Sequence, residues 1–148
     1  MRIRYANYQD GLDPLNSTVV AGRAELIELL DARRNNAPFF ARFSCDNGFQ
    51  IMMGVGRDLG CAQYSSVDGR APFLMGVSHR PLMRGGYIEF LAGDTPTAIA
   101  ARYILSFEEL KTVALYFLET GGRSDRVFWR ELDPKAVRED AARGLHLH

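Results

Sequence analysis

The sequence predicts an α+β fold, a mostly antiparallel β-meander sheet with an N-terminal helix and a long helix near the C-terminus packed on it. Two observations carry this prediction. Short runs of aromatic and aliphatic residues between positions 39 and 91 are separated by turn residues, as in antiparallel strands. Apolar residues at helical spacing occur before and after this region. Because the 148 residues contain no linker-like or repetitive stretch, we expect a single domain over 1–148.

The N-terminal part predicts a strand, a loop and a helix. Residues 3–8 alternate weakly, and residues 10–17 are rich in turn formers. A helix is expected over Arg23–Arg34, with Leu26, Ile27 and Leu30 as its apolar stripe. Asn35, Asn36 and Pro38 then end it.

The middle of the chain predicts the meander. Its candidate strands are Phe39–Ser44, Phe49–Val55, Cys61–Ser66, Phe73–Val77 and Tyr87–Leu91. Asn47-Gly48 and Asp68-Gly69 are strong hairpin signals. Gly54, Gly56 and Gly60 superficially resemble a phosphate-binding loop. Since they join two strands rather than a strand and a helix, a hairpin turn is favoured.

The C-terminal part contains the best-defined element. After a break at Gly93–Pro96, a short strand is expected near Arg102–Leu105. Ser106 and Glu109 form an S-x-x-E capping box that starts a helix, and Gly121-Gly122 ends it. The buried stripe of this helix is expected at Phe107, Leu110, Val113, Ala114 and Phe117. A final strand over Arg126–Arg130, with Val127 and Trp129 on one face, and a last helix from Asp133 to about Arg143 complete the prediction.

Composition excludes several functional classes. Lys+Arg and Asp+Glu both total 18, so the chain lacks the excess positive charge typical of nucleic-acid binders. Its two cysteines, Cys45 and Cys61, lie in apolar runs and do not indicate a disulfide framework. The N-terminus has no signal-like segment and no apolar run could cross a bilayer. We therefore expect a cytoplasmic protein with no membrane and no direct nucleic-acid partner.

Catalytic and metal-binding patterns are weak. His146 and His148 end the chain as H-L-H, which is more typical of a terminal tail than of a metal site. No metal-ligand cluster and no cofactor motif are present, so neither a metal nor a cofactor is expected. A Cys61–His79 nucleophile pair is conceivable and would require a depressed thiol pKa and rapid alkylation. The sequence favours a protein that binds rather than an enzyme.

The segment 101–132, ARYILSFEELKTVALYFLETGGRSDRVFWREL, resembles the C-terminal signature of immunity protein family one from bacterial polymorphic toxin systems. In that signature a helix ends in Phe and a Thr-Gly-x-Arg turn, and a strand with Val-x-Trp follows. The matching positions are Pro96, Ser106, Glu109, Ala114, Phe117, Thr120, Gly121, Arg123, Val127 and Trp129. Ser124 departs from the signature, which often has Pro there. The segment around Glu25–Leu30, Gly54-Val55-Gly56 and Gln63-Tyr64 follows the family order more faintly.

The resemblance implies an immunity protein for interbacterial competition, whose partner is a cognate toxin. Relatives protect against toxin domains that include nucleic-acid deaminases, by stoichiometric binding that covers the active site or the substrate groove. An alternative is a small-ligand or regulatory binding module on the same scaffold, which would need a large apolar pocket with convergent polar groups.

The matched residues build the scaffold, so toxin contacts are sought in the loops. Two regions are candidates. The hairpin ends contribute Arg57, Asp58, Tyr64, Asp68 and Arg70. The loop after the Phe73–Val77 strand contributes His79 and Arg80. Solvated turns and ordinary core residues would produce the same pattern.

Overall fold

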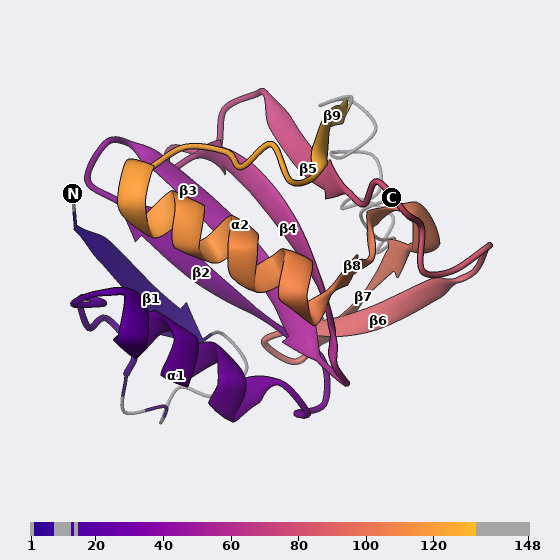
Figure 1. Ribbon diagram of the computed structural model, residues 1–148, viewed down its shortest axis with the longest axis horizontal. Coiled ribbons are helices and arrows are strands. Elements are labelled where there is room, and N and C mark those ends of the chain that lie inside the picture. Colours follow the sequence, from indigo (N-terminus) through magenta and orange to yellow (C-terminus); the bar gives the residue numbers. More distant parts are fainter. Residues whose placement is uncertain (1, 8–12, 14, 133–148) are drawn as a thin grey trace.

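The computed structural model describes residues 2–7, 13 and 15–132 (Figure 1). The last helix expected from Asp133, and His146 and His148, lie outside these residues. The elements in chain order are β1 (Ile3–Asn7), α1 (Arg23–Arg33), β2 (Phe39–Cys45), β3 (Phe49–Gly56), β4 (Leu59–Ser66), β5 (Phe73–Val77), β6 (Tyr87–Ala92), β7 (Thr95–Ala100), a 3-10 turn η1 (Ala101–Tyr103), β8 (Leu105–Ser106), α2 (Phe107–Thr120) and β9 (Phe128–Leu132).

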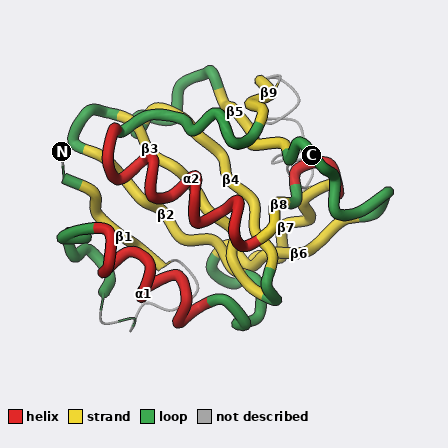
Figure 2. The backbone as a smooth tube through the Cα atoms, in the orientation of Figure 1, coloured by secondary structure: helices red, strands yellow, loops and turns green. Residues whose placement is uncertain are grey.

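The strands form one curled, mostly antiparallel sheet in the order β7-β6-β2-β3-β4-β5-β9 (Figure 2). The three central strands are β2, β3 and β4. On its outer side, each of the strands β2 and β4 pairs with two different strands. On one side β2 pairs with β1 along most of its length and with β6 at a single parallel position, Phe39 to Leu91. On the other side β4 pairs with both β5 and β8. This division curls the outer strands away from the plane of the central three.

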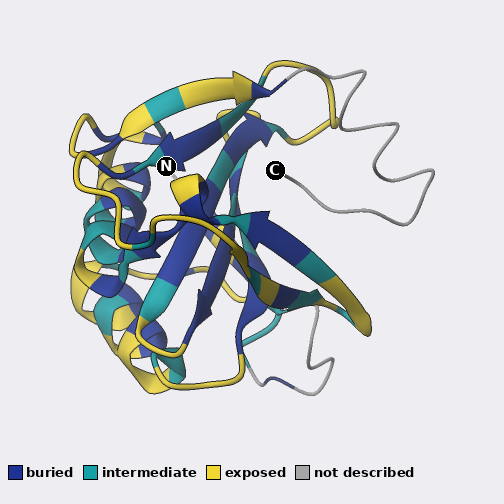
Figure 3. Ribbon diagram, turned by 90° about the vertical axis from the view of Figure 1, so that its right-hand side faces the viewer, coloured by how far each residue is buried: buried dark blue, intermediate teal, exposed yellow. Residues whose placement is uncertain are grey.

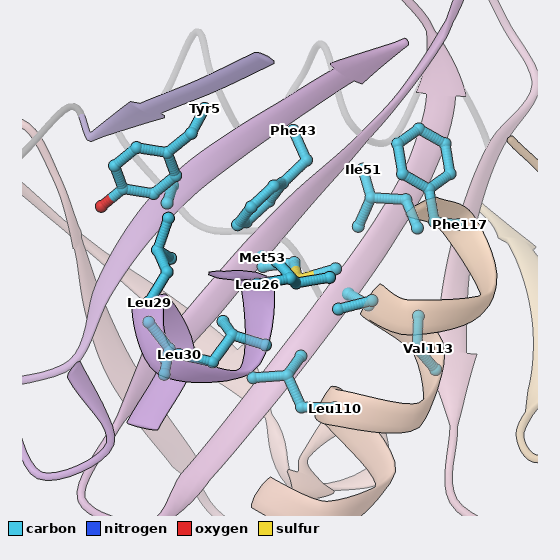
Figure 4. Packing of buried hydrophobic residues seen from close by; sticks show 14 of the residues in the cluster. Tyr5, Leu26, Leu29, Leu30, Phe43, Ile51, Met53, Leu110, Val113 and Phe117 are labelled. Atoms are coloured by element: carbon cyan, nitrogen blue, oxygen red, sulfur yellow. The ribbon is translucent and has the colours of Figure 1, made fainter. Parts of the chain in front are cut away.

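Both helices cover the same face of the central strands, the face toward the viewer in Figure 1. Figure 4 shows Leu26 of α1 beside Met53 of β3 and Leu110 of α2 beside Leu30 of α1, all within one apolar cluster. The capping box predicted for α2 is present: the Ser106 hydroxyl accepts from Glu109 N at 3.0 Å, and the Glu109 carboxylate accepts from Ser106 N at 2.9 Å. Gly121 closes α2 in the left-handed conformation, with φ of 71°.

The opposite face of the sheet has its own apolar cluster, because the β6–β7 hairpin and η1 fold over it. Phe90 of β6 packs on Phe40 of β2 with ring centroids 5.5 Å apart. Gly54 of β3 permits this approach, since a Cβ there would lie 2.6 Å from both Phe90 and the Cys61 sulfur. The protein therefore has two apolar layers, one on each side of the central strands.

Several expected boundaries are wrong. The break at Gly93–Pro96 contains the start of β7, where Pro96 is tolerated because β7 is the terminal strand in the sheet order. The strand near Arg102–Leu105 is mostly the 3-10 turn, with only Leu105–Ser106 extended. The final strand begins at Phe128 rather than Arg126, because residues 125 and 126 form a turn.

Two further expectations are corrected by packing. The meander stops at β5: β6 does not pair with β5 but with β2 and β7. The expected N-terminal helix is α1, and the strand β1 precedes it. The buried residues of α1 are Leu26, Leu29 and Leu30, whereas Ile27, expected in the apolar stripe, is only partly buried.

Candidate binding surfaces

The β3–β4 turn places Arg57 and Asp58 against the end of α1. Both residues adopt positive φ, 50° and 63°, as a two-residue hairpin turn requires, and the phosphate-loop alternative for these glycines is thereby rejected. Asp58 N donates to the Arg34 carbonyl at 2.9 Å, and its carboxylate pairs with the Arg34 side chain. Asp58 therefore already has a structural partner, whereas Arg57 is exposed.

Asp68 and Arg70 lie at the opposite end of β4, in the turn before β5. Asp68 accepts from the Ser66 hydroxyl and from Arg70 N. These two hydrogen bonds lower the pKa of Asp68 below its usual value. Eight residues of extended β4 separate this turn from Arg57 and Asp58, so the two hairpin ends do not form one site.

Tyr64 is a buried structural residue rather than an exposed anchor. Its ring stacks on Phe49 at 5.1 Å and meets Trp129 edge-on at 6.3 Å, while its hydroxyl donates to the Gly121 carbonyl at 3.1 Å. Burial raises the pKa of Tyr64. Tyr64 thus fixes the C-terminal end of α2 to the sheet.

His79 and Arg80 are exposed at the start of the β5–β6 loop, residues 78–86. The His79 ring stacks on Phe128 of β9, with centroids 3.9 Å apart and an interplanar angle of 21°. Ser78 anchors the loop, because its hydroxyl donates to the Glu109 carboxylate of α2 at 2.8 Å and accepts from Arg80 N at 3.1 Å. The loop faces the viewer in Figure 3, where exposed residues are yellow.

Local sequence patterns do not indicate several residues that the fold places around the β5–β6 loop. Phe128 is 61% exposed, and Tyr87, at the far end of the loop, is 58% exposed. Arg84 and Arg102 line a groove of 820 Å³ between the loop and the end of β7. The alternation of side chains along β9 predicts that Phe128 and Trp129 lie on opposite faces of the strand. No local sequence pattern indicates that η1 brings Arg102 next to the loop.

A buried charge cluster lies at another place, between β1 and α1. Arg33 pairs with Asp13 at 2.7 Å, and the side chains are only 14% and 4% exposed. Tyr5 donates to the same Asp13 oxygen at 2.9 Å, and Asn7 donates at 3.0 Å. Burial alone would raise the pKa of Asp13, but hydrogen bonds from Arg33 and Asn7 outweigh it and hold the pKa at about 2. Leu15 N donates to the other Asp13 oxygen at 2.9 Å, so both carboxylate oxygens accept hydrogen bonds and the cluster stabilises the fold.

Cys61 does not have the properties of a nucleophile. It is 1% exposed on the second apolar layer, and burial raises the pKa of its thiol to about 12. A nucleophilic cysteine needs the opposite shift and solvent access. His79, its conceivable partner, stacks on Phe128. Among residues 2–7, 13 and 15–132, no group of three or more His, Cys, Asp or Glu side chains could hold a metal ion.

Residues 16–131 match the family model for immunity protein Imm1. This range includes every helix and strand of the described fold except β1 and the last residue of β9. The chain belongs to the Imm1 immunity protein family. In general terms it is therefore an immunity protein, a class that acts on a cognate toxin. A comparison with curated proteins found no match. In the described part of the chain, no helix is long and apolar enough to span a membrane.

Proposed function

We propose that this protein binds its cognate bacterial toxin in a one-to-one complex and neutralises it by covering the active site or the substrate groove. The family match over residues 16–131 is the single observation that carries this proposal. The exposed aromatic and arginine side chains around the β5–β6 loop support it, because such residues are typical anchors of protein interfaces.

The finer features of the proposal follow from the resemblance. The toxin belongs to a polymorphic toxin system used between competing bacteria, and its toxic domain acts on nucleic acid as a deaminase or a nuclease. Neutralisation takes place in the cytoplasm of the producing cell. To protect at low protein concentration, the complex needs a dissociation constant of about 1 nM or below, which corresponds to about −12 kcal/mol.

Co-purification with the product of the adjacent toxin gene tests the proposal. The purified chain should form a one-to-one complex by light scattering and should abolish toxin activity at one molar equivalent. A protein that binds this toxin without inhibiting it, or that does not bind, would refute the proposed function. A cell that carries the toxin gene should survive only when it also expresses this chain.

A small-ligand module is a second candidate, favoured by one observation. Arg2, Arg4 and Arg42 line a groove of 380 Å³ on the sheet face opposite the helices, together with the single acidic residue Asp46. Such a groove would take a small anion rather than an apolar ligand. Thermal shift measurements with inorganic phosphate and pyrophosphate test it. A saturable increase in melting temperature that Arg2→Gln abolishes would favour this function, and no shift would exclude it for these anions.

A further inference from the structure

We infer that the toxin docks on the surface formed by the β5–β6 loop and its neighbours, and that the toxin side of this contact is acidic with an apolar centre. The inference rests on the proposed function and adds the binding face and the chemistry of the partner. We call this face the β5–β6 surface; it comprises His79, Arg80, Leu82, Arg84, Tyr87, Arg102 and Phe128.

Three exposed large apolar side chains border the β5–β6 loop. Among the described residues, Leu82, Tyr87 and Phe128 are 47%, 58% and 61% exposed, and the last two are the most exposed large apolar side chains. Of the other exposed large apolar residues, Phe49 and Val67 are neighbours at the start of β3 and just after β4, and Val19 and Tyr116 lie in the β1–α1 loop and on α2. A single exposed apolar residue is ordinary, but several that border one loop indicate an interaction site.

This surface is also fixed in position before any partner binds. Ser78 ties the start of the loop to Glu109 of α2, and the Gly86 carbonyl accepts from Ala101 N at 3.0 Å at its end. The stack of His79 on Phe128 holds the most exposed aromatic ring in one orientation. A rigid anchor loses little conformational entropy on association, which favours tight binding.

The charged side chains of the β5–β6 loop, and Arg102 beside it, are all basic. Exposed carboxylates, by contrast, border the surface at Glu89, two residues beyond Tyr87 on β6, and at Asp125, which lines a pocket with Phe128. The segment from Gly69 to Ile88 contains no Asp or Glu, although the whole chain has as many acidic as basic residues. Arg80 and Arg84 belong to this segment, and Arg102 borders the same groove. In the described part of the chain none of these three guanidinium groups forms an ion pair with a carboxylate.

On the helical face, two pairs of charges join α1 to α2. Arg23 of α1 pairs with Glu119 of α2 at 3.1 Å, and Lys111 of α2 lies 3.5 Å from Asp31 of α1. Charges that are paired within the molecule contribute little to attracting a partner. The three arginines of the β5–β6 surface instead remain available for carboxylates of the toxin, with which arginine forms bidentate hydrogen bonds.

The groove beside the loop sets the shape of the contact. Pro81, Met83 and Ala100 supply apolar atoms to its lining, and Arg84 and Arg102 contribute the charge. An apolar side chain of the toxin flanked by Asp or Glu would fit this arrangement. A nucleic acid would also meet arginines and aromatic rings, but the zero net charge of the chain favours a protein.

Charge reversal at Arg80→Glu, alone and with Arg84→Glu, and separately Phe128→Ala, tests the inference on the full chain with its adjacent-gene toxin. The matched control for the single reversal Arg80→Glu is Arg23→Glu, which makes the same change in net charge at an exposed position on α1, away from the loop. Circular dichroism and melting temperatures should match the wild type for all variants, since every altered side chain is exposed. Association and dissociation rates are measured by surface plasmon resonance at several salt concentrations.

We expect Phe128→Ala to raise the dissociation constant by about 30-fold or more, mainly through faster dissociation. The wild-type association rate should decrease with salt; the double charge reversal should remove this decrease and should raise the dissociation constant by on the order of 100-fold, and Arg80→Glu alone should raise it less. The control should bind like the wild type.

The outcomes separate this inference from the proposed function. If the wild type neither binds nor inhibits the toxin, the proposed function fails. If the wild type inhibits and all variants of the β5–β6 surface bind with unchanged constants, the function stands and the docking face is wrong. The inference is also overturned if these variants lose binding to a labelled DNA or RNA oligonucleotide instead of to toxin, or if they convert a wild-type dimer into a monomer.

Discussion

Replacing Asp13 with asparagine removes the charge of the buried Asp13–Arg33 pair while preserving the size of the side chain. The pKa of Asp13 lies at about 2, compared with 3.8 in an unfolded chain. A difference of about 1.8 pKa units corresponds to about 2 kcal/mol of stability at neutral pH. Arg33 would also lose its carboxylate at a side chain that is only 14% exposed, so the total loss should be about 2 to 3 kcal/mol.

The sign of the pH dependence follows from the lowered pKa. The carboxylate stabilises the fold above the unfolded pKa of 3.8, and this contribution is lost as the pH falls toward 2. Urea unfolding of the wild type and of Asp13→Asn should therefore differ most at pH 5 to 7 and converge only as the pH falls through about 2. Asp94→Asn, at an exposed carboxylate, is the control and should change little. Equal stability of wild type and Asp13→Asn at pH 7 would refute this account of the cluster.

Three further predictions address packing, capping and thiol chemistry. Gly54→Ala should destabilise the protein by about 1 to 3 kcal/mol in urea unfolding, because its Cβ would meet Phe90 at 2.6 Å, whereas Gly85→Ala meets nothing within 4 Å and should be neutral. Ser106→Ala removes the side-chain cap of α2 and should lower the midpoint of thermal unfolding by the equivalent of about 1 kcal/mol; an unchanged midpoint would contradict the role of the capping box. Cys61 should react with a thiol reagent at neutral pH only as fast as the protein unfolds, since its pKa of about 12 leaves almost no thiolate, and rapid labelling in the native state would reopen the enzyme hypothesis.

Local signals in the sequence predict the central elements well because those elements depend on local chemistry. The S-x-x-E box at Ser106 places the start of α2, and Asn47-Gly48 places the β2–β3 turn. The β6–β7 hairpin could not be predicted in this way. Its position depends on Phe90 packing against Gly54, a contact between residues far apart in the chain.

The same distinction, between features set by local sequence and features set by contacts between distant residues, applies to the candidate binding residues. The position of His79 and Arg80 in a loop after a strand predicts that both are exposed, and both are; their contact with a toxin stays a prediction. Tyr64 was selected as an aromatic residue near a turn, but its environment is set by Gly121 and Trp129, which only the fold brings next to it. Arg102 reaches the loop because η1 follows β7, an element that the sequence did not reveal.

Titration of toxin activity with this protein tests the central claim most directly. The toxin from the adjacent gene is held at a fixed concentration well above the expected dissociation constant, and residual activity is measured as the protein is added. We predict a linear decrease that reaches zero at one molar equivalent, which is the signature of tight stoichiometric inhibition. Full toxin activity in the presence of several equivalents of folded protein would contradict the claim.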